Sequence, residues 1–411
     1  MTNLPQGWKW KSLGEICFIT DGTHKTPNYI ETGIPFLSVK NISKGFFDLS
    51  DVKYISLEEH NKLIKRAKPE FGDILICRIG TLGKAIKISL EFEFSIFVSL
   101  GLLKPKVKII SDYLVYFLNS CFIEEWINDN KVGGGTHTAK LNLNILEKCP
   151  IALPPLKEQE RIVGILDESF AKIDESIKIL EQDLLNLDEL MQSALQKAFN
   201  PLKNNAKENY KLPQGWEWKS LGEIANTSSG GTPSRNKKEY WENGNIKWLK
   251  SGELNDGYID FIEENITEEA IKNSSAKIFQ KGTLLIAMYG ATAGKLGILN
   301  LDSTTNQAIC AFLHKDKNIK FLEKFLFYFL FFLRDKIIKD SFGGAQPNIS
   351  QTYIKNLQIP LPSLKEQEQI ASHLDELSSH VKNLKQNYQA QIKDLQELKK
   401  SLLDKAFKGN L

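Results

Sequence analysis

Two glycine-rich turns that end in lysine are the segments of this sequence whose residue types could bind a phosphate group. They are residues 80–84 (Gly-Thr-Leu-Gly-Lys) and 290–295 (Gly-Ala-Thr-Ala-Gly-Lys). A nucleotide-binding loop needs a serine or threonine directly after its lysine to coordinate Mg²⁺, but Ala85 and Leu296 stand there. A nucleotide site is therefore disfavoured. We expect the two lysines to contact phosphate groups of DNA, with a purely structural turn as the alternative.

Other polar side chains could read the edges of bases. Arginine pairs bidentately with guanine, and asparagine or glutamine with adenine. We therefore expect base contacts from Arg78, Tyr289, Gln346 and Asn348, with ion-paired surface side chains or turn stabilisers as the alternative. Contacts with DNA phosphates, against the alternative of solvated side chains, are expected from Lys25, Lys40, Arg235, Lys237 and Lys250. Within the two turns, we expect DNA contacts from Thr81, Lys84 and Lys295.

The residues that usually perform catalysis or bind metal do not occur in a recognisable pattern. The sequence contains neither an Asn-Pro-Pro-Tyr/Phe or Asp-Pro-Pro-Tyr methyltransferase motif nor a Gly-x-Gly-x-x-Gly cofactor motif. Its six histidines show no ligand spacing, and its five cysteines form no Cys-x-x-Cys pair. We therefore expect a chain that is not an enzyme and carries no metal or cofactor of its own.

The composition is that of an ordinary globular protein. The chain has 411 residues, of which 42% are hydrophobic and 25% charged, with a formal net charge of +3. The longest apolar run, residues 325–333, is shorter than the roughly 20 residues that cross a bilayer, so we expect it to be buried core. Because no signal peptide is recognisable and the cysteine number is odd, we expect a cytoplasmic protein.

An internal repeat divides the chain into two halves. Residues 4–16 return almost unchanged as 212–224, and Leu-Lys-Glu-Gln-Glu at 156–160 returns at 364–368. Lys-Ala-Phe likewise recurs at the end of each half. The loops between these segments differ freely, so we expect one scaffold with two different recognition surfaces. The repeated tryptophans, which we expect to pack in the core, are Trp8, Trp10, Trp216 and Trp218.

Each half is predicted to consist of an α+β globular domain followed by a long helix. The domains, 1–155 and 201–363, mix short β-rich runs with Gly/Asn/Thr punctuation, and each contains one helix, near 112–129 and 321–339. In 156–200 and 364–411, apolar residues are spaced alternately by three and four over about five heptads, which predicts coiled-coil helices. The globular parts are mildly basic and the first helix is acidic, as suits domains facing phosphates.

The ordered set of motifs resembles the specificity (S) subunits of Type I restriction–modification systems. The motifs are Leu-Pro-x-Gly-Trp at the start of each half, Gly-Asp-Ile-Leu at 72–75, the turn at 80–84, Gly-Gly-Ala-Gln-Pro-Asn-Ile at 343–349, and Leu-Pro-x-Leu-Lys-Glu-Gln-Glu before each helix. The resemblance covers nearly the whole chain. By position it also implies DNA contacts from Thr136, His137 and Lys140, although the segment 133–140 lacks the Gln-Pro-Asn of the second copy.

The resemblance implies an architecture and a set of partners. Two target-recognition domains in tandem are each followed by a helix, and the helices pair as an antiparallel coiled coil, so that two half-sites separated by a fixed spacer are read. The implied partners are double-stranded DNA, two methyltransferase (modification) subunits docked on the helices, and motor–nuclease (restriction) subunits, with a homodimer possible for the chain in isolation. S-adenosylmethionine, ATP and Mg²⁺ are expected on the partner subunits and none in this chain.

Two other functions are compatible with the sequence. The chain could be a non-catalytic coiled-coil scaffold whose globular halves bind proteins, which salt-dependent binding to duplex DNA would exclude. A self-contained methyltransferase or nuclease is disfavoured by the missing motifs. The leading interpretation remains a DNA-binding subunit with a bipartite, asymmetric target.

Overall fold

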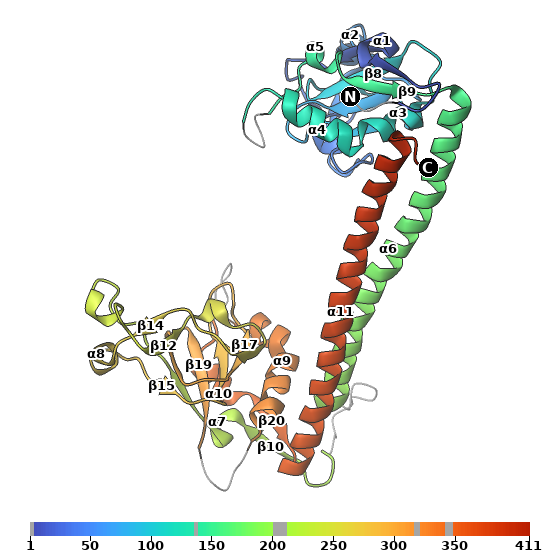
Figure 1. Cartoon of the computed structure of the whole chain (residues 1–411). Helices are drawn as coiled ribbons and strands as arrows, with labels where there is room; N and C mark the ends of the chain where they lie inside the picture. The colour runs from blue at the N-terminus through green and yellow to red at the C-terminus, as the bar shows by residue number, and fades with distance from the viewer. Residues whose placement is uncertain (1–3, 135–138, 200–211, 316–320, 342–347) are drawn as a thin grey trace. The chain divides into compact units, whose positions relative to one another are not determined.

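The computed structural model describes residues 4–134, 139–199, 212–315, 321–341 and 348–411. They fall into two compact units, one comprising Met1–Glu181 with Gln389–Leu411 and the other Gln182–Tyr388. Each unit contains one globular domain and a stretch of both long helices (Figure 1).

The first globular domain is built on short strands. They are β1 (Lys9–Ser12), β2 (Cys17–Asp21), β3 (Ile34–Leu37), β4 (Lys53–Ile55), β5 (Ile74–Cys77), β6 (Ala85–Lys87), β7 (Ser95–Ile96), β8 (Leu100–Pro105) and β9 (Pro150–Leu153). The main sheet has the antiparallel order β2-β8-β5-β6, and β4-β3-β7 form a second sheet. Every side chain of β5 is buried, as its uninterrupted apolar sequence favours. The β1–β9 ladder closes the domain just before the long helix.

The helices of this domain are short. They are α1 (Leu13–Ile16), α2 (Leu57–Leu63), α3 (Ser111–Leu118), α4 (Cys121–Asn130) and α5 (Leu143–Leu146). The single helix predicted near 112–129 is wrong, because it is broken between α3 and α4. Asn119 exchanges two hydrogen bonds with the backbone of Ala85 on β6 (2.8 and 3.2 Å), and the Ser120 hydroxyl donates to the Phe117 carbonyl (2.7 Å). These side chains compete with the helical backbone bonds, so the helix ends and restarts there.

The second globular domain repeats this plan with a larger main sheet. Its strands are β10 (Glu217–Ser220), β11 (Ala225–Ser229), β12 (Ile246–Leu249), β13 (Gly257–Ile259), β14 (Asn265–Ile266), β15 (Ile278–Phe279), β16 (Leu284–Ala287), β17 (Leu296–Leu299), β18 (Ser303–Thr305), β19 (Ile309–His314) and β20 (Gln358–Leu361). Its helices are α7 (Leu221–Ile224), α8 (Glu268–Lys272), α9 (Glu323–Lys339) and α10 (Gln351–Asn356). The main sheet has the order β11-β19-β16-β17-β13, with β14-β12-β18-β15 beside it and a β10–β20 ladder. The single helix predicted near 321–339 is confirmed as α9.

The two main sheets share a glycine at the same place. Gly22 follows β2 and Gly230 follows β11, at the repeat offset. A Cβ atom at Gly22 would collide with the carbonyl group of Ile96, and one at Gly230 with that of Thr305. In both copies of the repeat, the backbone turns here so close to a neighbouring segment that only glycine, which has no Cβ atom, fits. The duplication therefore preserves the scaffold at atomic detail.

Each long helix is anchored at its start by a buried glutamine. α6 (Leu156–Phe199) and α11 (Leu364–Phe407) both begin shortly after prolines. Both helices start at the predicted residue and end slightly before the predicted ends, 200 and 411. The Gln159 amide donates to the Pro154 carbonyl (2.9 Å) and accepts from the Ile110 N–H (2.9 Å). Gln367 makes the equivalent bonds to Pro362 (3.0 Å) and Leu322 (2.8 Å). The repeated Leu-Lys-Glu-Gln-Glu motif thus joins helix to domain.

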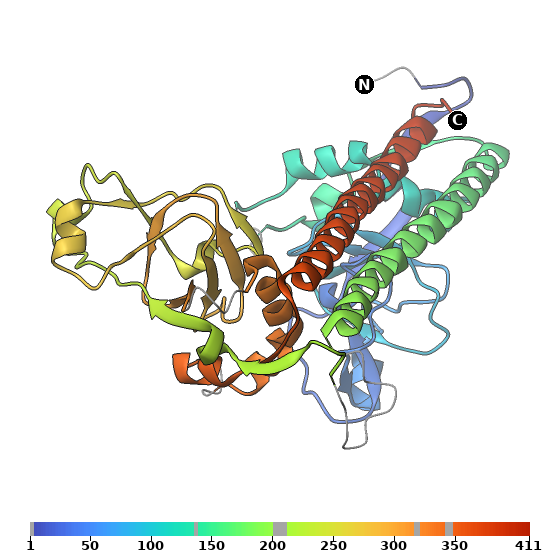
Figure 2. The same cartoon turned by 90° about the horizontal axis from the view of Figure 1, so that it is seen from below.

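The helix segments within each unit run antiparallel. In the first unit, Asp174 pairs with Lys399, and Arg161, earlier on α6, donates to the carbonyl of Leu411 at the far end of the chain (3.3 Å). In the second unit, Asp188 pairs with Lys385, and the late α6 residue Leu195 joins the same apolar cluster as the early α11 residue Leu374. The ribbons of α6 (green) and α11 (red) lie side by side in both Figure 1 and Figure 2. The predicted antiparallel coiled coil is confirmed.

The cores confirm most of the predicted burial. Residues 325–330 of α9 are buried among the side chains of the second domain, and no described helix is long and apolar enough to cross a membrane. Trp8 is buried, and Trp10 and Trp216 are partly buried. Trp218 is 52% exposed, so the prediction of core packing is wrong for this residue.

Candidate nucleic-acid interface

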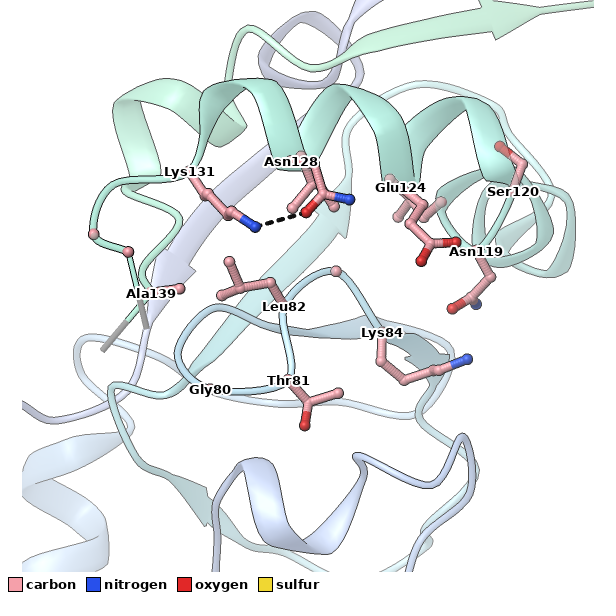
Figure 3. Close-up of a pocket in the computed structure, with 15 residues that line it drawn as sticks. Gly80, Thr81, Leu82, Lys84, Asn119, Ser120, Glu124, Asn128, Lys131 and Ala139 are labelled. Atoms are coloured by element: carbon pink, nitrogen blue, oxygen red, sulfur yellow. Dashed lines mark hydrogen bonds between the residues drawn. The ribbon is translucent and has the colours of Figure 1, made fainter. Parts of the chain in front are cut away.

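The register of the first sheet brings several loops to one edge. Cys77 at the end of β5 lies opposite Leu100 at the start of β8, and Asp21 at the end of β2 lies opposite Gly101. The loops 22–33, 78–84 and 97–99 therefore leave the sheet together, and we call this the first loop edge. Figure 3 shows the 78–84 loop beneath α4.

The first loop edge gathers the residues predicted in this domain. Lys25, Thr81 and Lys140 are exposed there, and Lys84 is half-buried in its turn. Lys140 pairs through its backbone with Val132 (2.8 and 2.9 Å), next to the 78–84 loop. The exposed Lys40 lies on the short helix Val39–Asn41, whose first N–H donates to the Ser99 hydroxyl of the same edge (3.1 Å). Thr136 and His137 lie outside the described residues.

Arg78 differs from its predicted role as a base reader. It is only 7% exposed, it pairs with the buried carboxylate of Asp21, and its Nε donates to the Leu141 carbonyl (3.0 Å). Burial raises the pKa of Asp21, but hydrogen bonds and charge from Arg66 and Arg78 outweigh it and hold the pKa below its usual value. Arg78 therefore connects its own loop to the end of β2, through Asp21, and to the segment that contains Leu141. Its guanidinium faces a protein carboxylate where the sequence suggested a base.

Two exposed side chains sit outside this ion pair and were missed by the sequence reasoning. Arg66 donates to the other oxygen of Asp21 (2.5 Å) with its side chain 54% exposed, and His24 lies 3.1 Å from Asp21 with its side chain 62% exposed. Arg66 follows α2, 45 residues from Asp21 in sequence. No local pattern links the two positions, so only the fold reveals the cluster.

A cavity of about 520 Å³ opens beside the first loop edge. Its walls are the turn 80–84, the face of α4 that carries Glu124 and Asn128, and Lys131 directly after this helix (Figure 3). The Lys131 ammonium donates to the Asn128 amide oxygen (2.8 Å), and the N–H₂ group of the same amide is a further donor beside the cavity. The amide and ammonium groups can donate to phosphates or base edges, and the carboxylate can accept from base amino groups.

The second sheet forms an equivalent edge. Ala287 at the end of β16 lies opposite Ile309 at the start of β19, so the loops 230–237, 288–295 and 306–308 leave the sheet together, and we call this the second loop edge. Tyr289 pairs through its backbone with the exposed Asn348. Burial raises the pKa of Tyr289, so its hydroxyl stays protonated and can donate. Lys295 is exposed at the end of its turn, and Gln346 lies outside the described residues.

Three of the cations predicted in the second domain already have partners within it. The guanidinium of Arg235 and the ammonium of Lys250 each lie 2.7 Å from an oxygen of Glu264. Burial raises the pKa of Glu264, but these two partners hold it below its usual value. Lys237 donates to the Tyr240 hydroxyl (3.0 Å). The three cations are therefore held in fixed positions.

The two loop edges differ chemically at matching positions. Where the first has the ion pair of Asp21 and Arg78, the second has Ser229 as the last residue of β11 and Met288 directly after β16. There Gln351 bonds the Ser229 hydroxyl and accepts from Thr227 (3.0 Å). A neutral hydrogen-bonded cluster thus replaces a charged one on the same scaffold.

Chemistry at the cysteines is disfavoured by their burial. It raises the thiol pKa to about 12 at Cys17, Cys77, Cys149 and Cys310. A thiol in that state is a poor nucleophile and metal ligand. Within the described ranges no group of three or more His, Cys, Asp or Glu side chains could hold a metal ion.

Comparison with family models matches the chain twice to the type I restriction modification DNA specificity domain, over residues 5–184 and 213–394. The specificity subunit of the type I restriction enzyme StySPI from Salmonella potsdam is 27% identical over 433 residues, which cover 99% of this chain and 90% of that protein. The EcoKI specificity subunit of Escherichia coli K12 is 26% identical over 434 residues, with 99% and 90% covered.

Solved structures show the same fold. A chain from a study of complex assembly and conformational transition in the type I R-M system aligns with a TM-score of 0.80 at 24% identity, covering all of both chains. The HsdS subunit from Thermoanaerobacter tengcongensis aligns with a TM-score of 0.61 at 23% identity, covering 100% of this chain and 99% of that one.

Proposed function

This chain belongs to the type I restriction–modification DNA specificity family, and on that premise we propose that it reads a bipartite, asymmetric target in duplex DNA, one half-site per globular domain. The observation that carries the proposal is the pair of loop edges: one repeated scaffold holds the exposed Arg66 against the buried Asp21 in one copy and the exposed Arg235 against Glu264 in the other. Different side chains on the same frame read different bases.

The distribution of charge supports duplex DNA as the ligand. Exposed lysines stand at both loop edges, among them Lys25 and Lys140 in the first and Lys295 in the second. Lysines at such positions neutralise phosphates and release counterions, which supplies affinity without sequence information. Base readers on the loops between them then supply discrimination.

The long helices are the proposed docking surface for partner subunits. Their outer faces expose aliphatic side chains, including Ile179, Leu185, Leu190 and Leu398. Such exposed apolar side chains on the long helices, of which α6 is acidic, suit a protein partner. By family membership these partners are two methyltransferase subunits and, with them, the motor–nuclease subunits. S-adenosylmethionine, ATP and Mg²⁺ then belong to the partners, and this chain performs no catalysis.

The test is to sequence methylated bases in the host genome with and without this gene. We expect a gene-dependent motif with two dissimilar half-sites around a non-specific gap. A palindromic or continuous motif would contradict the proposal. Binding of the full chain to duplex DNA, falling steeply with salt, separates it from a protein-binding scaffold, for which no such binding is expected.

A further inference from the structure

Arg235 is an exposed side chain of the second loop edge that is held by two tryptophans and a glutamate. Its guanidinium carbon lies 3.6 Å from the ring centre of Trp241 and 4.8 Å from that of Trp248, while Glu264 accepts from its Nη1 at 2.7 Å. The two indole rings stand at 90° with centres 5.0 Å apart, so they form a corner against which the guanidinium rests. Even so, the side chain is 51% exposed.

The loop that carries Arg235 is fixed by the same tryptophans. The indole N–H of Trp248 donates to the Gly231 carbonyl (2.9 Å), and that of Trp241 to the Ser234 carbonyl (3.1 Å). Trp248 lies on β12 and is buried, so the loop is joined to the sheet. The position and plane of the guanidinium are therefore set before any ligand arrives, and little conformational entropy is lost on binding.

The Arg235 loop also connects to the other residues of the second loop edge. Thr232 bonds the side chain of Gln307, and Gln307 bonds the hydroxyl of Tyr289. Tyr289 in turn pairs through its backbone with Asn348. Arg235 therefore belongs to the same surface as the candidate base readers.

The surroundings of Arg235 favour a ligand recognised by hydrogen-bond geometry over one recognised by charge. Glu264 offsets the positive charge, which weakens attraction to a phosphate, and its contact is with Nη1, one of the three nitrogens that carry the five N–H donors of the guanidinium. Lys250 occupies the second oxygen of Glu264 and keeps the carboxylate in place. A planar donor fork with a fixed orientation matches the O6 and N7 acceptors that guanine presents in the major groove.

We propose that Arg235, stacked on Trp241 and oriented by Glu264, reads a guanine in the half-site of the second domain. This inference rests on the proposed DNA-reading function and names one base of its target. It replaces the phosphate contact expected for Arg235 from the sequence with a base contact. Trp241 and Glu264 are positioning residues that hold the arginine.

The test uses the full chain on duplexes carrying its methylated motif, with each guanine of the second half-site replaced in turn. Replacing the base pair read by Arg235 should weaken wild-type binding by about 5- to 150-fold, the range for a bidentate contact. 7-Deazaguanine at that position, which lacks the N7 acceptor, should weaken it as well. Arg235→Lys keeps the charge but loses the fork, so it should bind the cognate duplex more weakly and no longer respond to either replacement. Its binding to random duplex and its salt dependence should stay unchanged.

Lys238→Ala is the matched control, since Lys238 begins the short 3₁₀ helix that follows the Arg235 loop and its side chain is 85% exposed. It should respond to guanine replacement as the wild type does. A thermal melt of each variant shows that it folds. The proposal is overturned if the half-site contains no guanine, if Arg235→Lys retains full discrimination, or if it loses affinity equally on every duplex. Failure of the wild-type chain to bind its motif would instead reject the proposed function.

Discussion

The centre of the Phe407 ring, on the last residue of α11, lies 4.9 Å from the centre of the Phe117 ring in the core of the first globular domain. The repeat places Phe199 at the end of α6. The centre of its ring lies 5.5 Å from the ring centre of Phe329 in the second domain. The end of α11, the helix that follows the second domain, therefore packs into the core of the first domain. The end of α6, which follows the first domain, packs into the core of the second. The Lys-Ala-Phe repeat is explained by this packing, and the end of the chain becomes part of the first domain.

We predict that Phe407→Ala destabilises the first unit by about 3–5 kcal/mol, the cost of truncating a buried phenylalanine. The ring also contacts Tyr113 (5.6 Å), so the cavity would be bordered by two aromatic side chains. Chemical denaturation of the full chain, followed by fluorescence, measures the loss. Phe71→Ala is the control, because that ring is 68% exposed and its removal should change stability little. Equal effects of the two substitutions would contradict the core role of Phe407.

A second prediction concerns the buried glutamine at the start of α6. Gln159→Ala leaves the Ile110 N–H and the Pro154 carbonyl without this partner, which costs about 1–3 kcal/mol. Gln182→Ala, on the exposed part of the same helix, should cost a few tenths of a kcal/mol at most. Denaturation midpoints of the two variants give the comparison. Should they coincide, the glutamine would not be what anchors the helix.

Features carried by repetition and periodicity could be predicted from the sequence. The two domains, the helices and their antiparallel pairing follow from the repeat, the heptads and the family resemblance, and the structure confirms them. The break between α3 and α4 could not, since it depends on Asn119 bonding to β6, which is 34 residues away in sequence. Trp218 likewise repeats Trp10, but the surroundings of the two copies differ.

The candidate sites were predicted less completely than the fold. The sequence identifies Arg78 and Arg235 as polar residues in loops, but their carboxylate partners lie 57 residues away, at Asp21, and 29 positions further along the chain, at Glu264. Whether an arginine faces bases, phosphates or a buried carboxylate is decided by such distant partners. The spacing of residues around each arginine does not indicate these distant partners.

A third prediction separates phosphate contacts from base contacts. Lys84→Ala and Lys295→Ala should each lower affinity by a similar factor on cognate and random duplexes, because a phosphate contact carries no sequence information. The slope of log K against log salt should fall by about 0.9 for each phosphate that the variant no longer neutralises. Binding titrations at several salt concentrations measure both quantities. Lys172→Ala, an exposed lysine on α6, is the control and should leave the slope unchanged.

The last prediction concerns the carboxylate of Asp21. Asp21→Asn leaves the buried Arg78 without its counter-charge, and breaking a buried ion pair costs about 3–5 kcal/mol. Because the pKa of Asp21 is lower in the folded chain than its usual 3.8, the carboxylate stabilises the fold above that pH, and the stabilisation is lost as pH falls through the folded-state pKa. The stability difference between wild type and Asp21→Asn should therefore be largest near neutral pH and shrink in acid. Denaturation at a series of pH values follows it.

The same substitution should also have a domain-specific effect on recognition. Asp21 orders the first loop edge only, since the second uses Ser229, Thr227 and Gln351 at the matching place. We therefore expect Asp21→Asn to relax discrimination in the first half-site and leave the second intact. Asp51→Asn, whose side chain is 75% exposed, is the matched control for both measurements. Loss of discrimination in both half-sites would mean that the substitution acts by unfolding the chain, and unchanged discrimination in the first would show that the ion pair of Asp21 and Arg78 does not position its readers.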